Sequence, residues 1–195
     1  MSLGLTLAVL LAAAPDGPAD APLDRILAAL RKPKTVAARF EQTKTHPAFS
    51  KPQVSRGHVF LARPARLDFT YETPHQVRIQ LEGTTLRLRY GRSGRTRTLD
   101  LADDPKMGLV FDTLRFFVDA DRARLEARYV VTVDGPTLEL VPKDAGLKKM
   151  VQRIRARADL DTGVLSEVEL LQSDGSRTTL RFLDPKIDGP APEAP

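Results

Sequence analysis

The chain has 195 residues, 42% of them hydrophobic, which is enough for one domain with a hydrophobic core. It has no cysteine, and this excludes a disulfide framework, a thiolate nucleophile, a lipid-bearing cysteine and a cysteine metal site. The formal net charge of +5 favours anionic partners, namely lipid head groups, nucleic acid or an acidic protein surface, without choosing among them.

The N-terminal segment contains an apolar run from Leu3 to Ala14. This run is too short to span a bilayer, which requires about 20 apolar residues, but it is typical of the hydrophobic region of a secretory signal. We therefore expect residues 1–20 to be a signal and linker of an exported protein, rather than a buried segment of a cytosolic one. A single domain over residues 21–184 and a disordered, proline-rich tail over residues 185–195 complete the expected organisation.

An amphipathic helix is predicted directly after this segment, from Pro22 to Lys32. Four apolar residues recur there at helical spacing and form one stripe: Leu23, Ile26, Leu27 and Leu30. Pro22 suits the first turn of a helix, and Pro33 ends it. A strand is predicted to follow from Thr35 to Thr45.

The stretch from Gly57 to Gly91 predicts four short strands separated by turn residues. Within these strands every second residue is apolar, as in the run from Leu67 to Tyr71. Successive side chains of a strand point to opposite faces, so the sheet has one apolar face and one polar or charged face. A further alternating strand is predicted from Arg95 to Leu101. The apolar face needs a cover, and the nature of that cover decides the function.

A second amphipathic helix is predicted from Asp104, a candidate N-cap that is followed by Pro105 at the first helical position. Its apolar face is expected to contain Met107, Val110, Phe111, Leu114, Phe117 and Val118. A short turn over residues 119–124 should lead from this helix back into strands.

The second half of the chain repeats the strand pattern. Strands are expected over residues 125–134, 138–140, 151–160, 164–171 and 178–183, with a loop or a single helical turn over residues 143–149. The predicted fold class is therefore mainly β (α+β), with about ten or eleven antiparallel strands and two helices.

No catalytic constellation is found. Asp161-Thr162-Gly163 matches the aspartic-protease triplet, but that chemistry needs two carboxylates sharing one proton, and the single copy lies at a predicted hairpin turn. Gly91-Arg92-Ser93-Gly94 lacks the context of a nucleophile elbow and is interpreted as a turn. Three isolated histidines, His46, His58 and His75, do not form a metal or acid–base cluster. We therefore expect a protein that is not an enzyme and that needs no cofactor or metal.

Rows of arginine are predicted on the polar faces of several strands: Arg87, Arg89, Arg95, Arg97, Arg153, Arg155 and Arg157. Nucleic-acid binding would require aromatic side chains among these charges for base stacking, but tryptophan is absent and the nearby aromatic residues fall on the apolar rows. Two interpretations stay open: a solvated basic surface that suppresses aggregation, or a surface that docks to an acidic partner or to lipid head groups.

Several short motifs occur in a specific order between Leu23 and Leu183. After the first amphipathic helix come Ala38-Arg39-Phe40-Glu41-Gln42, then the segment from Gly57 to Phe69 with Arg63-Pro64 at its turn, and later Leu138-Glu139-Leu140-Val141-Pro142-Lys143. Each motif is weak alone, but their order and spacing resemble those of the periplasmic outer-membrane lipoprotein carrier family, the LolA family.

This resemblance implies an incomplete antiparallel β-barrel of about 11 strands, with an α-helical lid over its concave hydrophobic face. In the family, the acyl chains of lipoproteins occupy the cavity during transit through the periplasm. An inner-membrane ABC transporter loads them, and an outer-membrane lipoprotein receptor of similar fold accepts them. That receptor is anchored through a lipid-bearing cysteine, so a chain without cysteine resembles the soluble carrier. By this resemblance we expect a periplasmic monomer that binds acylated lipoproteins and no nucleic acid.

The family's key arginine corresponds to Arg63, which by resemblance bonds carbonyl groups of the lid helix and holds the empty cavity shut; an ordinary turn arginine is the alternative. The expected lining of the hydrophobic cavity comprises Phe40, Phe60, Leu67, Phe69, Tyr71, Leu86, Leu88, Tyr90, Phe111, Leu114 and Phe117. A dry core without a ligand is the alternative for each of these residues. Other functions considered are a lipid or glycolipid shuttle or an envelope sensor of the same fold, a basic nucleic-acid-binding barrel and, last, an enzyme.

Overall fold

The computed structural model describes residues 21–101, 103 and 118–190 of the chain. These residues form an antiparallel sheet of eleven strands in the order β6-β5-β4-β3-β2-β1-β11-β10-β9-β8-β7. The first six strands are β1 (Thr35–Thr45), β2 (Gln53–Ala62), β3 (Arg66–Thr73), β4 (Val77–Glu82), β5 (Thr85–Tyr90) and β6 (Thr96–Asp100). The other five are β7 (Tyr129–Asp134), β8 (Thr137–Pro142), β9 (Val151–Asp159), β10 (Val164–Gln172) and β11 (Arg177–Ile187).

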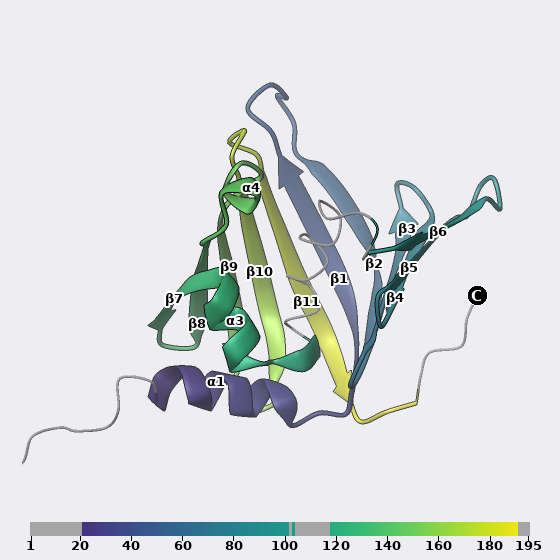
Figure 1. Ribbon diagram of the computed structural model, residues 1–195. Coiled ribbons are helices and arrows are strands. Elements are labelled where there is room, and N and C mark those ends of the chain that lie inside the picture. The colour runs from purple at the N-terminus through teal and green to yellow at the C-terminus, as the bar shows by residue number, and fades with distance from the viewer. Residues whose placement is uncertain (1–20, 102, 104–117, 191–195) are drawn as a thin grey trace, which may run out of the picture.

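The first and last strands of the chain meet in the middle of the sheet, because β1 pairs with β11. From there each half of the chain extends the sheet outward by successive antiparallel neighbours, and β6 and β7 form its two edges. The edges do not pair with each other, so the sheet is an incomplete barrel. Figure 1 shows it curving around the helices, which lie on one of its faces. The mainly β fold class predicted from the alternating patterns is confirmed.

The register decides which face of the sheet each side chain occupies, because residues paired across neighbouring strands share a face. Leu61 pairs with Leu67, Leu67 with Leu81, and Leu81 with Leu86. The face with these leucines is called the inner face, and it is the one that the helices cover (Figure 1). The outer face has the intervening polar and charged residues.

Three helices lie wholly within the described residues: α1 (Ala21–Arg31), α3 (Arg122–Arg128) and α4 (Ala145–Lys148). α1 confirms the amphipathic helix predicted from Pro22, and α4 is the single helical turn expected within residues 143–149. The helix predicted from Asp104 lies outside the described residues, except for its last position, Val118. No helix in the described part of the chain has the length and apolar character needed to cross a membrane.

α3 replaces the start of a predicted strand, since residues 125–128 are helical and β7 begins only at Tyr129. The carboxylate of Asp121 caps α3 by accepting a hydrogen bond from the backbone N–H of Arg124 at 3.1 Å. The alternation that suggested a strand was ambiguous, because Leu125 and Tyr129 are four residues apart and also fit one face of a helix. Both side chains are buried.

β11 continues to Ile187, which corrects the expectation that a disordered tail begins at residue 185. Pro185 is tolerated because β10 pairs only with residues 177–181 of β11, so the missing N–H of proline does not interrupt that ladder. Just beyond the strand, the Asp188 carboxylate accepts a hydrogen bond from the backbone N–H of Lys34 at 2.6 Å. This contact ties the end of β11 to the start of β1.

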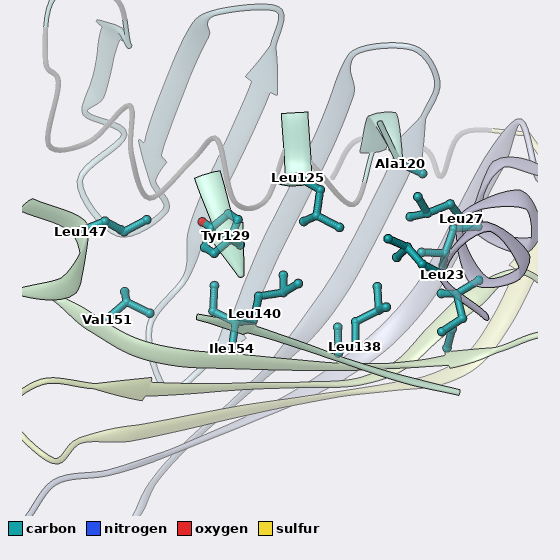
Figure 2. Close-up of a cluster of buried hydrophobic side chains, with 14 residues drawn as sticks. Leu23, Leu27, Ala120, Leu125, Tyr129, Leu138, Leu140, Leu147, Val151 and Ile154 are labelled. Atoms are coloured by element: carbon teal, nitrogen blue, oxygen red, sulfur yellow. The ribbon is translucent and has the colours of Figure 1, made fainter. Parts of the chain in front are cut away.

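The first hydrophobic cluster fills the space between the helices and strands β8 and β9. Figure 2 shows Leu23 and Leu27 of α1 on one side of it, with Leu138 and Leu140 on the strand below. Its buried members are Leu23, Ile26, Leu27, Leu30, Ala120, Leu125, Tyr129, Leu138, Leu140, Leu147, Val151, Ile154, Ala156 and Ala158. The apolar stripe of α1 is therefore used to cover this half of the inner face.

The second hydrophobic cluster lies on the other half of the sheet: Ala38, Phe40, Val59, Leu67, Phe69, Leu81, Leu86 and Val118. The rings of Phe40 and Tyr71 meet edge to face, with centroids 4.9 Å apart. Gly57 pairs with both residues from the strand between them. A Cβ at Gly57 would lie 1.9 Å from the carbonyl oxygen of Thr70, so only glycine fits this close contact of β2 with β3.

Candidate functional site

An apolar cavity of about 90 Å³ lies between the C-terminal end of α1 and the inner face of the sheet. Its lining comes from α1, from β1, β2, β3, β10 and β11, and from two turns: Leu30, Val36, Ala38, Val59, Leu61, Arg63, Leu67, Phe69, Gly163, Val164, Leu165, Val168, Leu180 and Phe182. The cavity is therefore located where the two halves of the chain meet in the sheet. Arg63 is the one charged side chain in this lining.

Arg63 follows β2 and reaches the C-terminal end of α1. Its Nε donates a hydrogen bond to the carbonyl oxygen of Pro33 at 3.0 Å, and its Nη2 donates to the carbonyl oxygen of Leu30. The last carbonyls of a helix lack partners within the helix, and the helix dipole favours a cation at this end. Arg63 thus holds the end of α1 against the rim of the cavity, at the position that the family resemblance implies for the latch.

The guanidinium of Arg63 is partly buried. Burial lowers the pKa of Arg63, whereas nearby Asp119 raises it and nearby Arg31 lowers it. Nη1 is buried and has no hydrogen-bond partner among the described residues. Because arginine keeps its proton in proteins, the rim of the apolar cavity contains a charged group that is only partly satisfied.

A second arginine joins α1 to the segment that leads into α3. Nε and Nη2 of Arg31 both donate to the carbonyl oxygen of Ala120, at 3.1 and 2.9 Å. Near the other end of α1, Nη1 of Arg122 lies 3.0 Å from the carboxylate of Asp24. Through these contacts α1 and α3 form one covering layer over the sheet.

Gly163, in the turn between β9 and β10, sets how closely α1 approaches the sheet. Its φ is +70°, and a Cβ built there would lie 2.2 Å from the carbonyl oxygen of Ala29 and 3.0 Å from Cδ of Pro33. Any side chain at this position would push against the backbone of α1. The sequence identified Gly163 as a turn residue, but gave no sign of its contact with the helix.

The structure brings together six of the residues predicted to line the cavity. They lie on the inner face, in or against the second hydrophobic cluster: Phe40, Leu67, Phe69, Tyr71, Leu86 and Leu88. Only Leu67 and Phe69 of these also line the cavity itself. Tyr90 lies apart at the end of β5, with 43% of its surface exposed. The remaining three on the predicted helix, Phe111, Leu114 and Phe117, lie outside the described residues.

Phe60 lies on the outer face, which corrects the expectation that it lines the cavity. It pairs with Asp68 across β2 and β3, and the guanidinium carbon of Arg66 lies 5.5 Å from its ring centroid. Val59, Phe60 and Leu61 are successive apolar residues of one strand, so they cannot all point inward. Val59 and Leu61 line the cavity, and Phe60 therefore points away from it.

Several lining residues were missed by the sequence analysis, above all those on β10 and β11: Val164, Leu165, Val168, Leu180 and Phe182. The alternation over residues 178–183 had placed Leu180 and Phe182 on one face of a strand. What the sequence lacked was the pairing of β11 with β1, which aligns Phe182 with Phe40 and Leu180 with Gln42.

A polar pair lies beside these apolar residues on the inner face. The hydroxyl of Tyr71 donates a hydrogen bond to Oε1 of Gln42 at 2.8 Å. Burial raises the pKa of Tyr71, so the hydroxyl stays protonated and its hydrogen bond satisfies it within the apolar surface. Among the described residues no group of three potential metal ligands occurs. The arrangement can bury an apolar group and provides a cation at the rim.

Known proteins that resemble this chain include one family and several solved structures of similar fold. Residues 31–193 match the sequence model of a family described as outer membrane lipoprotein carrier protein LolA. A putative outer membrane lipoprotein-sorting protein domain from Vibrio parahaemolyticus has a similar structure, with a TM-score of 0.51 and 11% identity over 88% of this chain and 93% of that chain. No curated protein sequence matches significantly.

Two further structures are similar over most of this chain. One is a chain of the Pseudomonas aeruginosa MucA/MucB complex, with a TM-score of 0.52 and 16% identity over 91% of this chain and 59% of that chain. The other is a LolA superfamily protein from Nitrosomonas europaea, with a TM-score of 0.47 and 12% identity over 90% of this chain and 96% of that chain. At these identities the two structures with TM-scores above 0.5 establish the fold alone.

Proposed function

Because this chain belongs to the LolA family of outer membrane lipoprotein carriers, we propose that it binds the acyl chains of lipoproteins in the apolar cavity beneath α1. It acts as a periplasmic carrier, which receives lipoproteins from an inner-membrane ABC transporter and delivers them to the outer membrane, where a lipoprotein receptor accepts them. The proposed activity is binding and transfer by a monomer, without chemical catalysis, a cofactor or nucleic acid.

The observation that supports this proposal most is the contact of Arg63 with two carbonyl groups at the end of α1, at the rim of an otherwise apolar cavity. A charged side chain in a purely structural core would be costly. At the rim of a covered cavity it has a use, because its hydrogen bonds to backbone oxygens can be broken without disturbing the apolar packing. The contact is thus suited to a latch that holds α1 reversibly against the sheet.

The cavity is too small for an acyl chain unless α1, its cover, moves away from the sheet. Its volume of about 90 Å³ is well below the roughly 300–1,000 Å³ of ordinary ligand sites, so α1 must move to admit an acyl chain. Burial of the acyl chain contributes about 0.8 kcal/mol of binding free energy per CH₂ group. The free energy needed to open the cover is subtracted from this gain. Binding is thereby weakened, which permits release to an acceptor.

A tryptophan at Leu67 should block the cavity. Leu67 is buried and lines the cavity. A larger side chain there fills the space, and overpacking of this kind costs about 1–3 kcal/mol. We therefore expect Leu67→Trp to weaken binding of a fluorescent acyl probe by about ten-fold, measured by equilibrium titration. Val130→Trp is the matched control, because Val130 is 54% exposed on β7. Equal probe binding by Leu67→Trp and the wild type would refute the cavity assignment.

A lipid or glycolipid shuttle, or an envelope sensor, is the second candidate. The observation that favours it is the similarity in fold to a chain of the MucA/MucB complex, in which the partner is a protein. Mass spectrometry of molecules that copurify with the protein from membranes separates the two candidates. Acylated peptides would support the lipoprotein carrier, whereas free glycolipid without acylated peptides would support the alternative.

A further inference from the structure

Arginine side chains on most of the outer face are neutralised by carboxylates of neighbouring strands. Four such ion pairs have distances between 2.7 and 3.3 Å: Arg56 with Glu41, Arg155 with Glu139, Arg181 with Glu167, and Arg177 with Glu169. Opposite charges facing each other across strands stabilise a sheet. These four arginines, on β2, β9 and β11, therefore have a structural explanation.

Strands β4 and β5 depart from this pattern. Their register places Arg78 directly opposite Arg89 on the outer face, although like charges in this position are destabilising. Arg89 forms no ion pair with a carboxylate in the part of the chain that the structure describes. Arg78 has Asp68 at 3.4 Å, but its Nε is buried and has no hydrogen-bond partner among the same residues. The ion pair with Asp68 gives Arg78 a structural partner, whereas Arg89 has no such partner among the described residues.

The two arginines line a cleft of about 340 Å³ near the end of β3, together with Thr70, Glu72, Gln76 and Gly91. Gly91 forms part of one wall, and its backbone N–H donates a hydrogen bond to the carbonyl oxygen of Gln76 at 2.9 Å. A Cβ at Gly91 would lie only 2.6 Å from Cβ of Gln76. The close approach that shapes this wall therefore requires glycine.

The carboxylate of Glu72 also lines the cleft, but its Oε1 contacts Nδ1 of His58 at 2.9 Å, and it forms no ion pair with either arginine among the described residues. The cleft thus combines the guanidinium groups of Arg78 and Arg89 with the hydroxyl of Thr70. Guanidinium groups bind phosphate oxygens through paired hydrogen bonds.

We propose that this outer-face cleft binds a phosphate group. Three donor side chains suit the several oxygens of a phosphate better than the two of a carboxylate, and the cleft has room for the group to which the phosphate is attached. The phosphate could belong to a soluble phosphate ester or to a phospholipid head group, which share this chemistry. The site lies on the face opposite the apolar cavity and does not depend on what the cavity binds.

The test uses the whole chain and two probes. Inorganic phosphate is titrated at constant ionic strength against chloride, while the arginine Nε–H and Gly91 backbone N–H signals are followed by nuclear magnetic resonance. Vesicles of phosphatidylcholine with and without phosphatidylglycerol are compared by cosedimentation. We expect Arg89→Gln to weaken binding about ten-fold, because hydrogen bonds to charged groups are among the stronger ones. Arg89 is exposed, so this change should leave the fold intact.

Arg97→Gln is the matched control. It removes the same charge from the neighbouring strand, but Arg97 pairs with Leu88, and this pair lies on the inner-face side of the sheet. Binding of inorganic phosphate that is lost in Arg89→Gln and kept in Arg97→Gln would support a site for soluble phosphates. The same variant pattern with phosphatidylglycerol vesicles alone would support a head-group site. Equal losses in both variants, or no binding of either probe, would overturn the proposal.

Discussion

Replacing Arg63 with alanine is expected to tighten binding of an acyl probe and to slow its release. The change removes both hydrogen bonds that Arg63 donates to the end of α1. Hydrogen bonds to charged groups contribute about 1.5–3 kcal/mol each, so the covered arrangement loses at least this much relative to the open one. An affinity gain of about ten-fold or more should follow, measured by fluorescence titration, with release followed by transfer to vesicles.

Two matched variants separate this effect from loss of charge in general. Arg56→Ala removes an outer-face arginine whose partner is Glu41 at 2.7 Å; exposed pairs contribute about 0–1 kcal/mol, so probe binding should not change. Arg63→Lys keeps a cation but loses the planar fork that reaches both carbonyl groups, and an intermediate affinity is expected. Unchanged affinity and release in Arg63→Ala, with an intact fold, would mean that Arg63 is an ordinary turn residue.

Replacing Gly163 with alanine should have the largest effect on stability. Its φ of +70° costs a side chain about 1–3 kcal/mol, and the new Cβ would collide with the carbonyl oxygen of Ala29 on α1. Overpacking of this kind adds about 1–3 kcal/mol. We expect the collision to push α1 away from the sheet, so exposure of the cavity to an apolar dye should rise as the free energy of unfolding falls.

Gly83 provides the control for this variant. It also has a positive φ, of +59°, but a Cβ there would meet nothing within 4 Å. Gly83→Ala therefore measures the backbone strain alone, and the difference between the two variants measures the contact with α1. We expect Gly163→Ala to lose more unfolding free energy than Gly83→Ala in chemical denaturation, and to bind more dye. Equal losses without added dye binding would contradict a close fit between Gly163 and α1.

Local patterns were sufficient for most of the fold. The alternation over residues 67–71 and the helical spacing from Leu23 to Leu30 each fix an element and its buried face, because strands and helices have different periods. α3 was missed since Leu125 and Tyr129 fit either period over so short a stretch. The informative signal was Asp121, a good N-cap residue three positions before Arg124. Its carboxylate accepts a hydrogen bond from the backbone N–H of Arg124.

The candidate site was harder to predict, because it depends on contacts between distant segments. Leu180 and Phe182 line the cavity only since β11 pairs with β1 across the middle of the sheet, and no local pattern encodes that pairing. Phe60 was placed wrongly because hydrophobicity alone does not tell which face an apolar residue occupies. Arg63 came from the family resemblance; its bonds to Leu30 and Pro33 are contacts between residues about thirty positions apart.

In the proposed mechanism α1 is a movable cover, which an acyl chain displaces when it binds. Because the chain has no cysteine, one spin label can be attached at Arg25→Cys on α1 and one at Lys186→Cys on β11, both exposed positions. Electron paramagnetic resonance then measures the distance between the two labels with and without a saturating acyl probe. We predict that the distance changes when the probe binds, and that Arg63→Ala shifts part of the population in the same direction without the probe. A bound probe that leaves the distance unchanged would contradict the claim.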